Sequence, residues 1–198
     1  MNPKLIVVAA FAAALSLASA VQAATFTIAG GNPFTLGASY DPNPGTPDLA
    51  PGASGIRNGA LSLADAGRVT FSYFGKEAAY ANQFWVNGLK RFDTAAASNA
   101  SFTLTLGARL LPFEFRTLSP ADAVANGASS AFHNSIALFQ QSATTVFALF
   151  NDGSASDKDY DDIVVRMDVA PVPLPAAAWL LVAGLGGLGA VARRRKAA

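Results

Sequence analysis

The residues best suited to chemistry lie in one acidic segment, residues 151–162, with the sequence Asn-Asp-Gly-Ser-Ala-Ser-Asp-Lys-Asp-Tyr-Asp-Asp. Five of the 13 acidic residues of the chain fall within it. Carboxylates held this close repel one another, and a hard cation with oxygen ligands relieves the repulsion. The candidate calcium ligands are Asn151, Asp152, Asp157, Asp159, Asp161 and Asp162.

The spacing of Asp157, Asp159 and Asp161 matches positions 1, 3 and 5 of an EF-hand loop, but the rest of the segment does not. Position 6 is Asp162 rather than glycine, and position 12 is Asp168 rather than glutamate. The following residues alternate like a strand, whereas an EF-hand continues into a helix. Two interpretations stay open: a calcium site of another kind, or a solvated acidic turn that needs no metal.

Groups for other kinds of catalysis are scarce in this chain. It has one histidine, His133, and no cysteine, which makes a catalytic triad hard to build and excludes a thiolate nucleophile or metal site. Glu77 and Glu114 are the only glutamates. A glycosidase needs two carboxylates facing each other across a cleft, and no pattern indicates such a pair. The sequence favours a protein that is not an enzyme, and a secreted hydrolase is the least favoured hypothesis.

The acidic segment must be positioned by strands, because period-two alternation recurs along the middle of the chain. The expected strands are 25–28, 69–74, 102–106, 109–116, 135–139, 144–150 and 163–169. Residues 59–66 and 120–126 read as helical turns, and the proline-rich region 41–55 reads as a surface loop. Many short strands without a long helix predict an all-β fold, namely a single antiparallel β-sandwich, jelly-roll-like.

The first 23 residues have the features of a secretory signal peptide. Lys4 gives a positive start, residues 5–18 are apolar apart from Ser16, and small residues stand at cleavage spacing before Ala23. Cleavage after Ala23 would leave a mature chain that begins at Ala24. Because no cysteine is present, the chain is not expected to be a lipoprotein.

The last 27 residues, 172–198, combine a proline motif, an apolar run and a basic end. The 21 residues 172–192 carry no charge, which is the length of a membrane-spanning helix. The motif consists of Val172, Pro173, Leu174, Pro175 and Ala176. The basic end, expected to act as a membrane stop on the cytoplasmic side, consists of Arg193, Arg194, Arg195 and Lys196.

This C-terminal order resembles the VPLPA form of the PEP-CTERM sorting signal of Gram-negative bacteria. The resemblance rests on residues 172–181, on the glycine-rich stretch 184–189 and on the basic cluster. It implies an export pathway, a transient stay in the inner membrane, and cleavage near the motif by an exosortase, a membrane enzyme resembling cysteine proteases. It also implies delivery to the cell surface or extracellular matrix. It says nothing about the activity of the preceding domain.

Residues 24–171 are expected to form the exported domain, with nine Lys and Arg against 13 acids and a net charge of −4. A mildly acidic domain is a poor nucleic-acid binder, so no nucleic-acid partner is expected. Six aromatics are candidates either for the core or for a sugar-stacking platform: Phe71, Tyr73, Phe74, Tyr80, Phe84 and Trp85.

The acidic segment also resembles the closing motif of a bacterial domain of unknown function found in surface proteins. In that motif, Glu/Asn-Asp-Gly and a spacer precede Asp-x-Asp-Tyr-Asn-Asp and a final strand. Residues 151–153 and 157–162 match it, except that Asp161 stands where asparagine is common. The resemblance implies a β-rich surface module.

The leading hypothesis is therefore a non-enzymatic, exported surface or matrix protein in which calcium plays a structural role. The alternative is a calcium-dependent module that binds exopolysaccharide or another glycan. The alternative predicts exposed aromatic side chains near the acidic segment.

Overall fold

The computed structural model describes residues 23–42, 48–77, 80–119, 121–130, 134–153, 159–172, 183–187, 189, 193 and 194. The chain divides into two units, residues 23–171 and a second unit made of residues 1–22 and 172–198. In the second unit, residues 183–187, 189, 193 and 194 have helical backbone. No helix within the described residues has the length and apolar character needed to cross a membrane. The expected signal peptide and most of the expected membrane helix and sorting signal lie outside the described residues.

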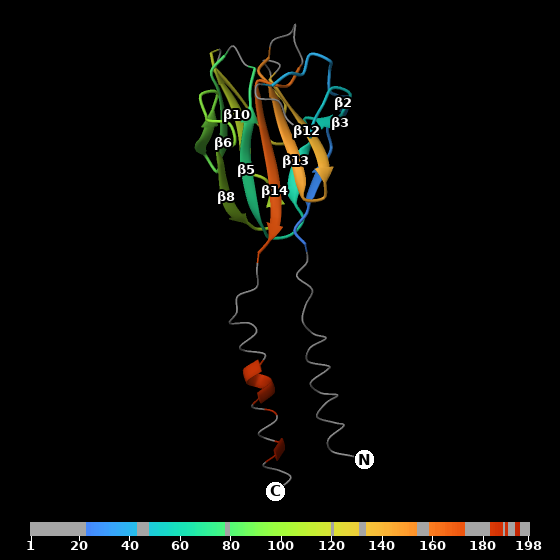
Figure 1. Cartoon of the computed structure of the whole chain (residues 1–198), viewed down its shortest axis with the longest axis vertical. Helices are drawn as coiled ribbons and strands as arrows, with labels where there is room; N and C mark the ends of the chain where they lie inside the picture. The colour runs from blue at the N-terminus through green and yellow to red at the C-terminus, as the bar shows by residue number, and fades with distance from the viewer. Residues whose placement is uncertain are drawn as a thin grey trace. The chain divides into compact units, whose positions relative to one another are not determined.

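Among the described residues, the unit 23–171 holds three antiparallel sheets (Figure 1). In sheet order, the seven-stranded sheet contains β2 (Asn32–Thr35), β3 (Ser54–Arg57), β12 (Ser135–Ser142), β13 (Thr145–Asn151), β14 (Ile163–Pro171), β5 (Gly67–Gly75) and β8 (Ser101–Leu106). The four-stranded sheet contains β11 (Ala121–Ala125), β10 (Phe113–Leu118), β6 (Asn82–Val86) and β7 (Leu89–Asp93). The three-stranded sheet contains β1 (Phe26–Ala29), β4 (Ala60–Leu63) and β9 (Arg109–Leu110).

The expectation of an all-β, antiparallel fold is confirmed, but the single sandwich is replaced by three sheets. Residues 59–66 and 120–126 are not helical turns, because they contain strands β4 and β11. Both segments are rich in alanine, which favours helix locally, but their place beside β1 and β10 decides the outcome. Asn126 reinforces this arrangement, since its side-chain oxygen accepts from Leu61 N at 2.8 Å. The loop expected over 41–55 ends earlier, because β3 begins at Ser54.

The main hydrophobic core lies between one face of the seven-stranded sheet and the two smaller sheets. Along β5, buried residues alternate with more exposed ones, as the period of a strand requires. Phe115 of β10 stacks on Phe150 of β13, with ring centroids 5.0 Å apart and planes 4° from parallel. Phe71 and Phe84 join the same cluster from β5 and β6. Aromatic side chains from facing sheets therefore hold the layers together.

A second, smaller core covers the other face of the seven-stranded sheet. There Phe139, Phe147 and Leu149 of the central strands pack against residues of the segment 34–53 and against Tyr160. Strand β13 is consequently buried along its whole length. The acidic segment begins at the end of this buried strand and leads into β14, which is also largely buried. The two described ends of the segment, residues 151–153 and 159–162, are therefore positioned by the two hydrophobic cores.

Candidate metal centre

The acidic segment joins β13 to β14 in the sequence, so its described ends lie at the end of the domain where β14 begins (Figure 1). The structure describes residues 151–153 and 159–162 of this segment. Asp157, one of the six candidate ligands, lies outside the described residues. The other five are all buried, with exposed fractions of 1–8%.

Tyr160 anchors the end of the segment in the second core. Its side chain is 1% exposed, its ring centroid lies 4.5 Å from that of Phe34, and its hydroxyl is hydrogen-bonded to Ser135 Oγ at 2.7 Å. Its backbone has a φ of 63°, in the left-handed region that non-glycine residues rarely adopt. Burial of the ring offsets this strain. It also positions Asp159 and Asp161, the residues directly before and after Tyr160 in the sequence.

Three carboxylates converge beside this anchor: those of Glu77, Asp159 and Asp161. One carboxylate oxygen from each lies within 4.8 Å of the others. Glu77 follows strand β5, and its backbone N–H donates to Asp161 O at 2.8 Å. Asp161 is 1% exposed and Asp159 is 7% exposed, whereas Glu77 is exposed. We call Glu77, Asp159 and Asp161 the carboxylate triad.

The electrostatics of the triad disfavour its fully ionised form. The pKa of Asp161 is raised to about 7, chiefly by burial; the negative charges of Asp159 and Glu77 add to the rise, and a hydrogen bond from Asp41 N partly opposes it. That bond, from Asp41 N to Asp161 Oδ2, is 2.7 Å long. Among the described residues, the ion pairs lie elsewhere and leave the triad without a cationic side chain.

The triad has the geometry to hold a hard cation. Calcium binds oxygens at 2.3–2.6 Å, so two of its ligands lie within about 5 Å of each other. The spread of the triad oxygens fits that limit. Calcium takes six to eight oxygens, and backbone carbonyls or water can complete the set. The triad can therefore supply charge and part of the coordination shell.

A second polar group lies next to the triad along the chain. Asn82 Nδ2 donates to Asp152 Oδ2 at 2.8 Å, and Asp152 N donates to Asp162 Oδ2 at 2.7 Å. Asn151, which closes β13, precedes Asp152 directly. We call Asn82, Asp152 and Asp162 the amide–carboxylate group. It links β6 of the four-stranded sheet to the end of β13 in the seven-stranded sheet.

The sequence-predicted ligands thus separate into two sets. Asp159 and Asp161 belong to the triad, Asp152 and Asp162 belong to the amide–carboxylate group, and Asn151 ends β13 just before Asp152. Sequence reasoning missed Glu77 and Asn82 as members of these sets. A signal existed for Glu77, because one of only two glutamates follows a clear strand. No pattern indicated Asn82.

The six aromatics considered for a sugar-stacking platform do not form one surface. Phe71, Tyr73 and Phe84 are buried in the main core, and Phe74 packs against the second core. Trp85 is half-buried, with the Arg116 guanidinium 3.9 Å from its ring centroid. Tyr80 is 47% exposed.

No family model matches the chain, and no curated protein matches it. Among solved structures it is similar to a high-affinity mannose-binding lectin of Ralstonia solanacearum, with a TM-score of 0.32 and 14% sequence identity over 57% of this chain and 92% of that chain. It is also similar to lectin CV2L of Chromobacterium violaceum in complex with alpha-methyl-fucoside, with a TM-score of 0.30 and 14% identity over the same shares. Likeness at this level leaves function to be argued from the residues of this chain alone.

Proposed function

We propose that residues 24–171 form a non-enzymatic, calcium-stabilised module of an exported surface or extracellular-matrix protein. The convergence of Glu77, Asp159 and Asp161 carries this proposal. Buried carboxylates without a cationic partner destabilise a fold unless they are protonated or bind a metal. A bound calcium ion relieves the repulsion and ties the end of β5 to the start of β14.

The proposed location outside the cell suits a weak calcium site. Extracellular calcium modules bind with dissociation constants of about 10⁻⁴–10⁻³ M, and an exported protein meets calcium directly. A cation that binds only the native state at a hundred times its Kd stabilises it by about 2.7 kcal/mol. In this proposal calcium acts on the stability of the module and takes no part in a reaction.

Thermal melting of the full chain in detergent, with calcium or with chelator, tests this role. Calcium is expected to raise the Tm, and Glu77→Gln is expected to remove most of that rise. Glu114→Gln is the matched control, because Glu114 pairs with Arg116 on the four-stranded sheet, away from the triad. An equal Tm with calcium and with chelator, across millimolar calcium, would exclude the structural role.

The route to the surface is part of the same proposal and rests on the two ends of the sequence. The signal peptide is removed after Ala23, and the C-terminal segment holds the chain in the inner membrane until an exosortase cleaves near residues 172–176. Pro173→Ala with Pro175→Ala is expected to leave an uncut chain in the inner membrane. Asp161→Asn is the control, because it leaves both signals unchanged. Normal release of the double proline variant would contradict exosortase processing at this motif.

A second candidate function is calcium-dependent glycan binding, and Tyr80 is the observation that favours it. This aromatic side chain is 47% exposed and lies between Glu77 of the triad and Asn82 of the amide–carboxylate group in the sequence. Aromatic faces stack on sugar rings. Tyr80→Ala is expected to weaken retention on immobilised exopolysaccharide while the calcium-dependent rise in Tm is unchanged. Equal retention of the variant and the parent chain would exclude this role of Tyr80.

A further inference from the structure

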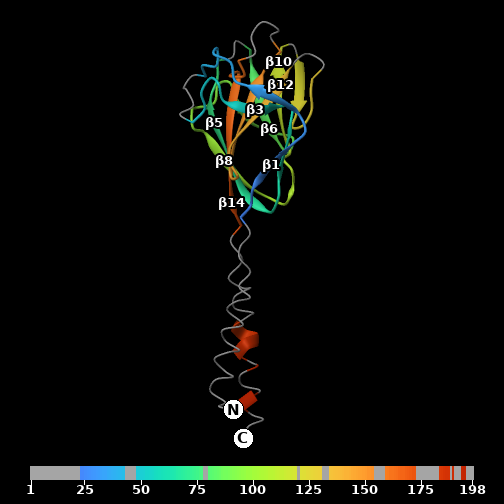
Figure 2. The same ribbon diagram turned by 90° about the vertical axis from the view of Figure 1, so that its right-hand side faces the viewer.

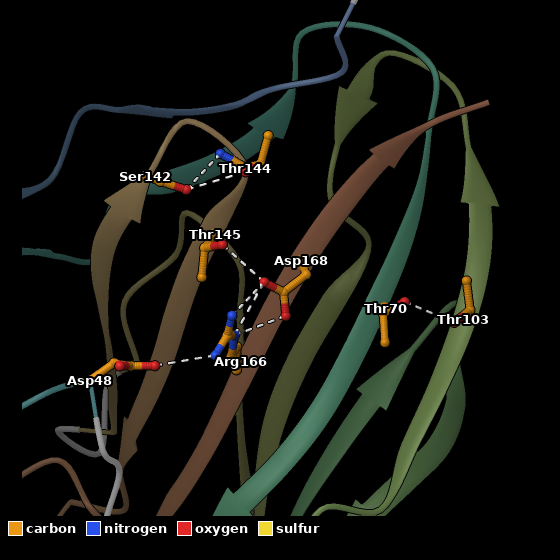
Figure 3. Close-up of polar contacts among 8 residues, drawn as sticks. All are labelled: Asp48, Thr70, Thr103, Ser142, Thr144, Thr145, Arg166 and Asp168. Carbon is orange, nitrogen blue, oxygen red and sulfur yellow. Dashed lines mark hydrogen bonds and ion pairs between the residues drawn. The ribbon is translucent and has the colours of Figure 1, made fainter. Parts of the chain in front are cut away.

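Strand β8 is an open edge of the seven-stranded sheet. Among the described residues it pairs with β5 alone, along its whole length from Ser101 to Leu106. Figure 3 shows Thr103 on this edge strand beside Thr70 of β5. An unpaired strand edge presents backbone donors and acceptors to which another strand can bind. The edge of β8 is therefore a candidate surface for a partner.

The hydrogen bonds of β5 show which backbone groups of β8 point outward. Tyr73 N donates to Ala100 O at 2.9 Å, so the backbone of Tyr73 faces the β8 side of the sheet. In an antiparallel ladder, residues that exchange hydrogen bonds with the neighbouring strand alternate with residues that do not. By the register of the two strands, residues 102, 104 and 106 bond to β5. The N–H and C=O groups of Ser101, Thr103 and Thr105 therefore point away from β5.

The other sheet edges among the described strands are bonded, short or charged. At β1, Phe26 N donates to Ala143 O, and Phe26 O accepts from Gln140 Nε2. Strand β9 has two residues, β2 contains Pro33, and β7 and β11 carry the charged side chains of Lys90, Arg91, Asp93 and Asp122. Strand β8, with the sequence Ser-Phe-Thr-Leu-Thr-Leu, has six residues without a charge or a proline. Short length, charges and prolines are the devices that keep an edge from pairing, and β8 has none of them.

We propose that β8 pairs antiparallel with β8 of a second copy of this chain, about a two-fold axis at Thr103. In this register Thr103 pairs with Thr103 of the second copy, and Ser101 pairs with Thr105, through the backbone groups that point outward. Phe102 lies opposite Leu104 in the intervening pairs, where side chains approach most closely. Directly opposed residues lie on the same face, so hydroxyls meet hydroxyls on one face of the sheet and apolar side chains meet on the other. The sequence of β8 is therefore complementary to itself.

The apolar side chains of β8 favour this occupant. Phe102 and Leu104 pack against the main core but are only half-buried, because no further strand covers them among the described residues. A second β8 covers the apolar surface that they leave exposed, which favours association. A two-fold pairing uses the open edge of both copies, and Pro33 lacks a backbone donor at the opposite edge of the sheet, so the assembly ends at two copies. This pairing goes beyond the proposed calcium role and does not depend on it.

Disulfide cross-linking of the full chain in detergent tests the pairing, because the chain has no cysteine of its own. In the proposed dimer the two Cα atoms of residue 103 lie about 5.5 Å apart, within the range that a disulfide spans. Thr103→Cys is expected to give a covalent dimer on mild oxidation. Thr70→Cys is the matched control, because Thr70 lies beside Thr103 but its two copies are three strand spacings, about 14 Å, apart. No dimer from Thr103→Cys, or equal yields from the two variants, would overturn the proposal.

Thr103→Lys tests the same pairing without a covalent bond. It places two like charges opposite each other at the two-fold axis, which disfavours pairing, while residue 103 stays exposed on its own strand. Sedimentation of the full chain in detergent is expected to show a concentration-dependent dimer for the parent chain and its loss in Thr103→Lys. Association through the C-terminal segment is the same in both chains and cannot produce this difference. A monomeric parent chain, or equal association of the two chains, would overturn the pairing. The calcium-dependent rise in Tm is expected to be equal in both chains, so the calcium role stands or fails separately.

Discussion

Carboxylates occupy two contrasting environments along β14, one just before the strand begins and one near its end. Figure 3 shows Asp168 with Arg166, whose Nε donates to Asp168 Oδ2 at 2.9 Å, and with Thr145, whose hydroxyl donates to Oδ1 at 2.9 Å. Arg166 also lies 3.3 Å from Asp48. Asp161, just before β14, is instead buried beside two further carboxylates.

The difference shows that the position of a carboxylate along β14 decides whether a neighbouring side chain neutralises its charge. Arg166 and Asp168 are two residues apart, so they project from the same face of the sheet and neutralise each other. Thr70 and Thr103 extend this polar face, with their hydroxyls 2.9 Å apart (Figure 3). The ion pairs among the described residues do not include the triad, so we expect its stability to depend on pH and, in the proposed role, on calcium.

The largest expected effect on stability comes from removing Tyr160, the aromatic residue that positions the triad and has no role at Asp168. Tyr160→Ala removes a fully buried ring and leaves a non-glycine residue at a φ of 63°. We expect a loss of about 3–5 kcal/mol in the free energy of unfolding, as for other large aromatic truncations in cores. The response to calcium is expected to be lost with it, because the ring positions Asp159 and Asp161. Urea unfolding with and without calcium measures both effects.

Tyr160→Phe is the matched control for that experiment. It keeps the ring and removes only the hydrogen bond to Ser135, at a cost of about 0.5–1.5 kcal/mol. The calcium response is expected to persist. A full calcium response in Tyr160→Ala would show that the carboxylates converge without their aromatic anchor.

The next effect is a dependence of stability on pH that originates at the triad. The pKa of Asp161 is about 7 in the folded state and near 3.8 without the fold, so the folded state binds a proton more tightly. In chelator, the free energy of unfolding is therefore expected to fall as pH rises from about 4 to about 7, and to level off above. Calcium binds the ionised form, so its stabilising effect should grow over the same interval.

Asp161→Asn is expected to remove this slope, because the amide still accepts from Asp41 N but does not titrate. Asp168→Asn is the control on the same strand and is expected to retain it. Thermal melting at a series of pH values in chelator compares the three chains. Equal slopes in the parent chain and Asp161→Asn would assign the pH dependence to another group.

The smallest effect is expected at the ion pairs of Arg166. Arg166→Met keeps the length of the apolar stem but breaks the pairs with Asp48 and Asp168. Partly exposed pairs contribute about 0.2–1 kcal/mol, and salt screens them. Urea unfolding at low and high salt should show a small loss that shrinks with salt, and an unchanged response to calcium. A changed calcium response would mean that the two environments are coupled along β14.

Local patterns were enough to predict most of the fold. Alternation located β5, β8, β12, β13 and β14, because a strand buried on one or both faces leaves its period or its apolar run in the sequence. The short strands β2 and β3 contain Pro33 and Gly55, which mask that signal. The number of sheets was not predictable, since it depends on which strands pair across long separations.

The candidate site was predictable only on the side of the acidic segment. Asp159 and Asp161 are close in sequence, so their charge density is visible there. Glu77 reaches them because β5 pairs with β14, and Asn82 reaches Asp152 across 70 residues of sequence. Such contacts arise from topology and leave no local pattern.

The position of Gly67 has a consequence for how the module can be rearranged. A Cβ at Gly67 would lie 2.7 Å from Ala24 Cβ and 2.5 Å from Val169 Cγ2, and Gly67 pairs with Pro171, so the start of the module and the end of β14 both lie beside Gly67. Figures 1 and 2 show β1 and the end of β14 at the same end of the domain. Strand β14 has nine residues, each rising about 3.3 Å, which places the acidic segment roughly 26 Å away. A circular permutant that joins residue 171 to residue 24 and opens at the exposed turn of Asn87 and Gly88 would therefore keep every strand pairing and both groups of carboxylates.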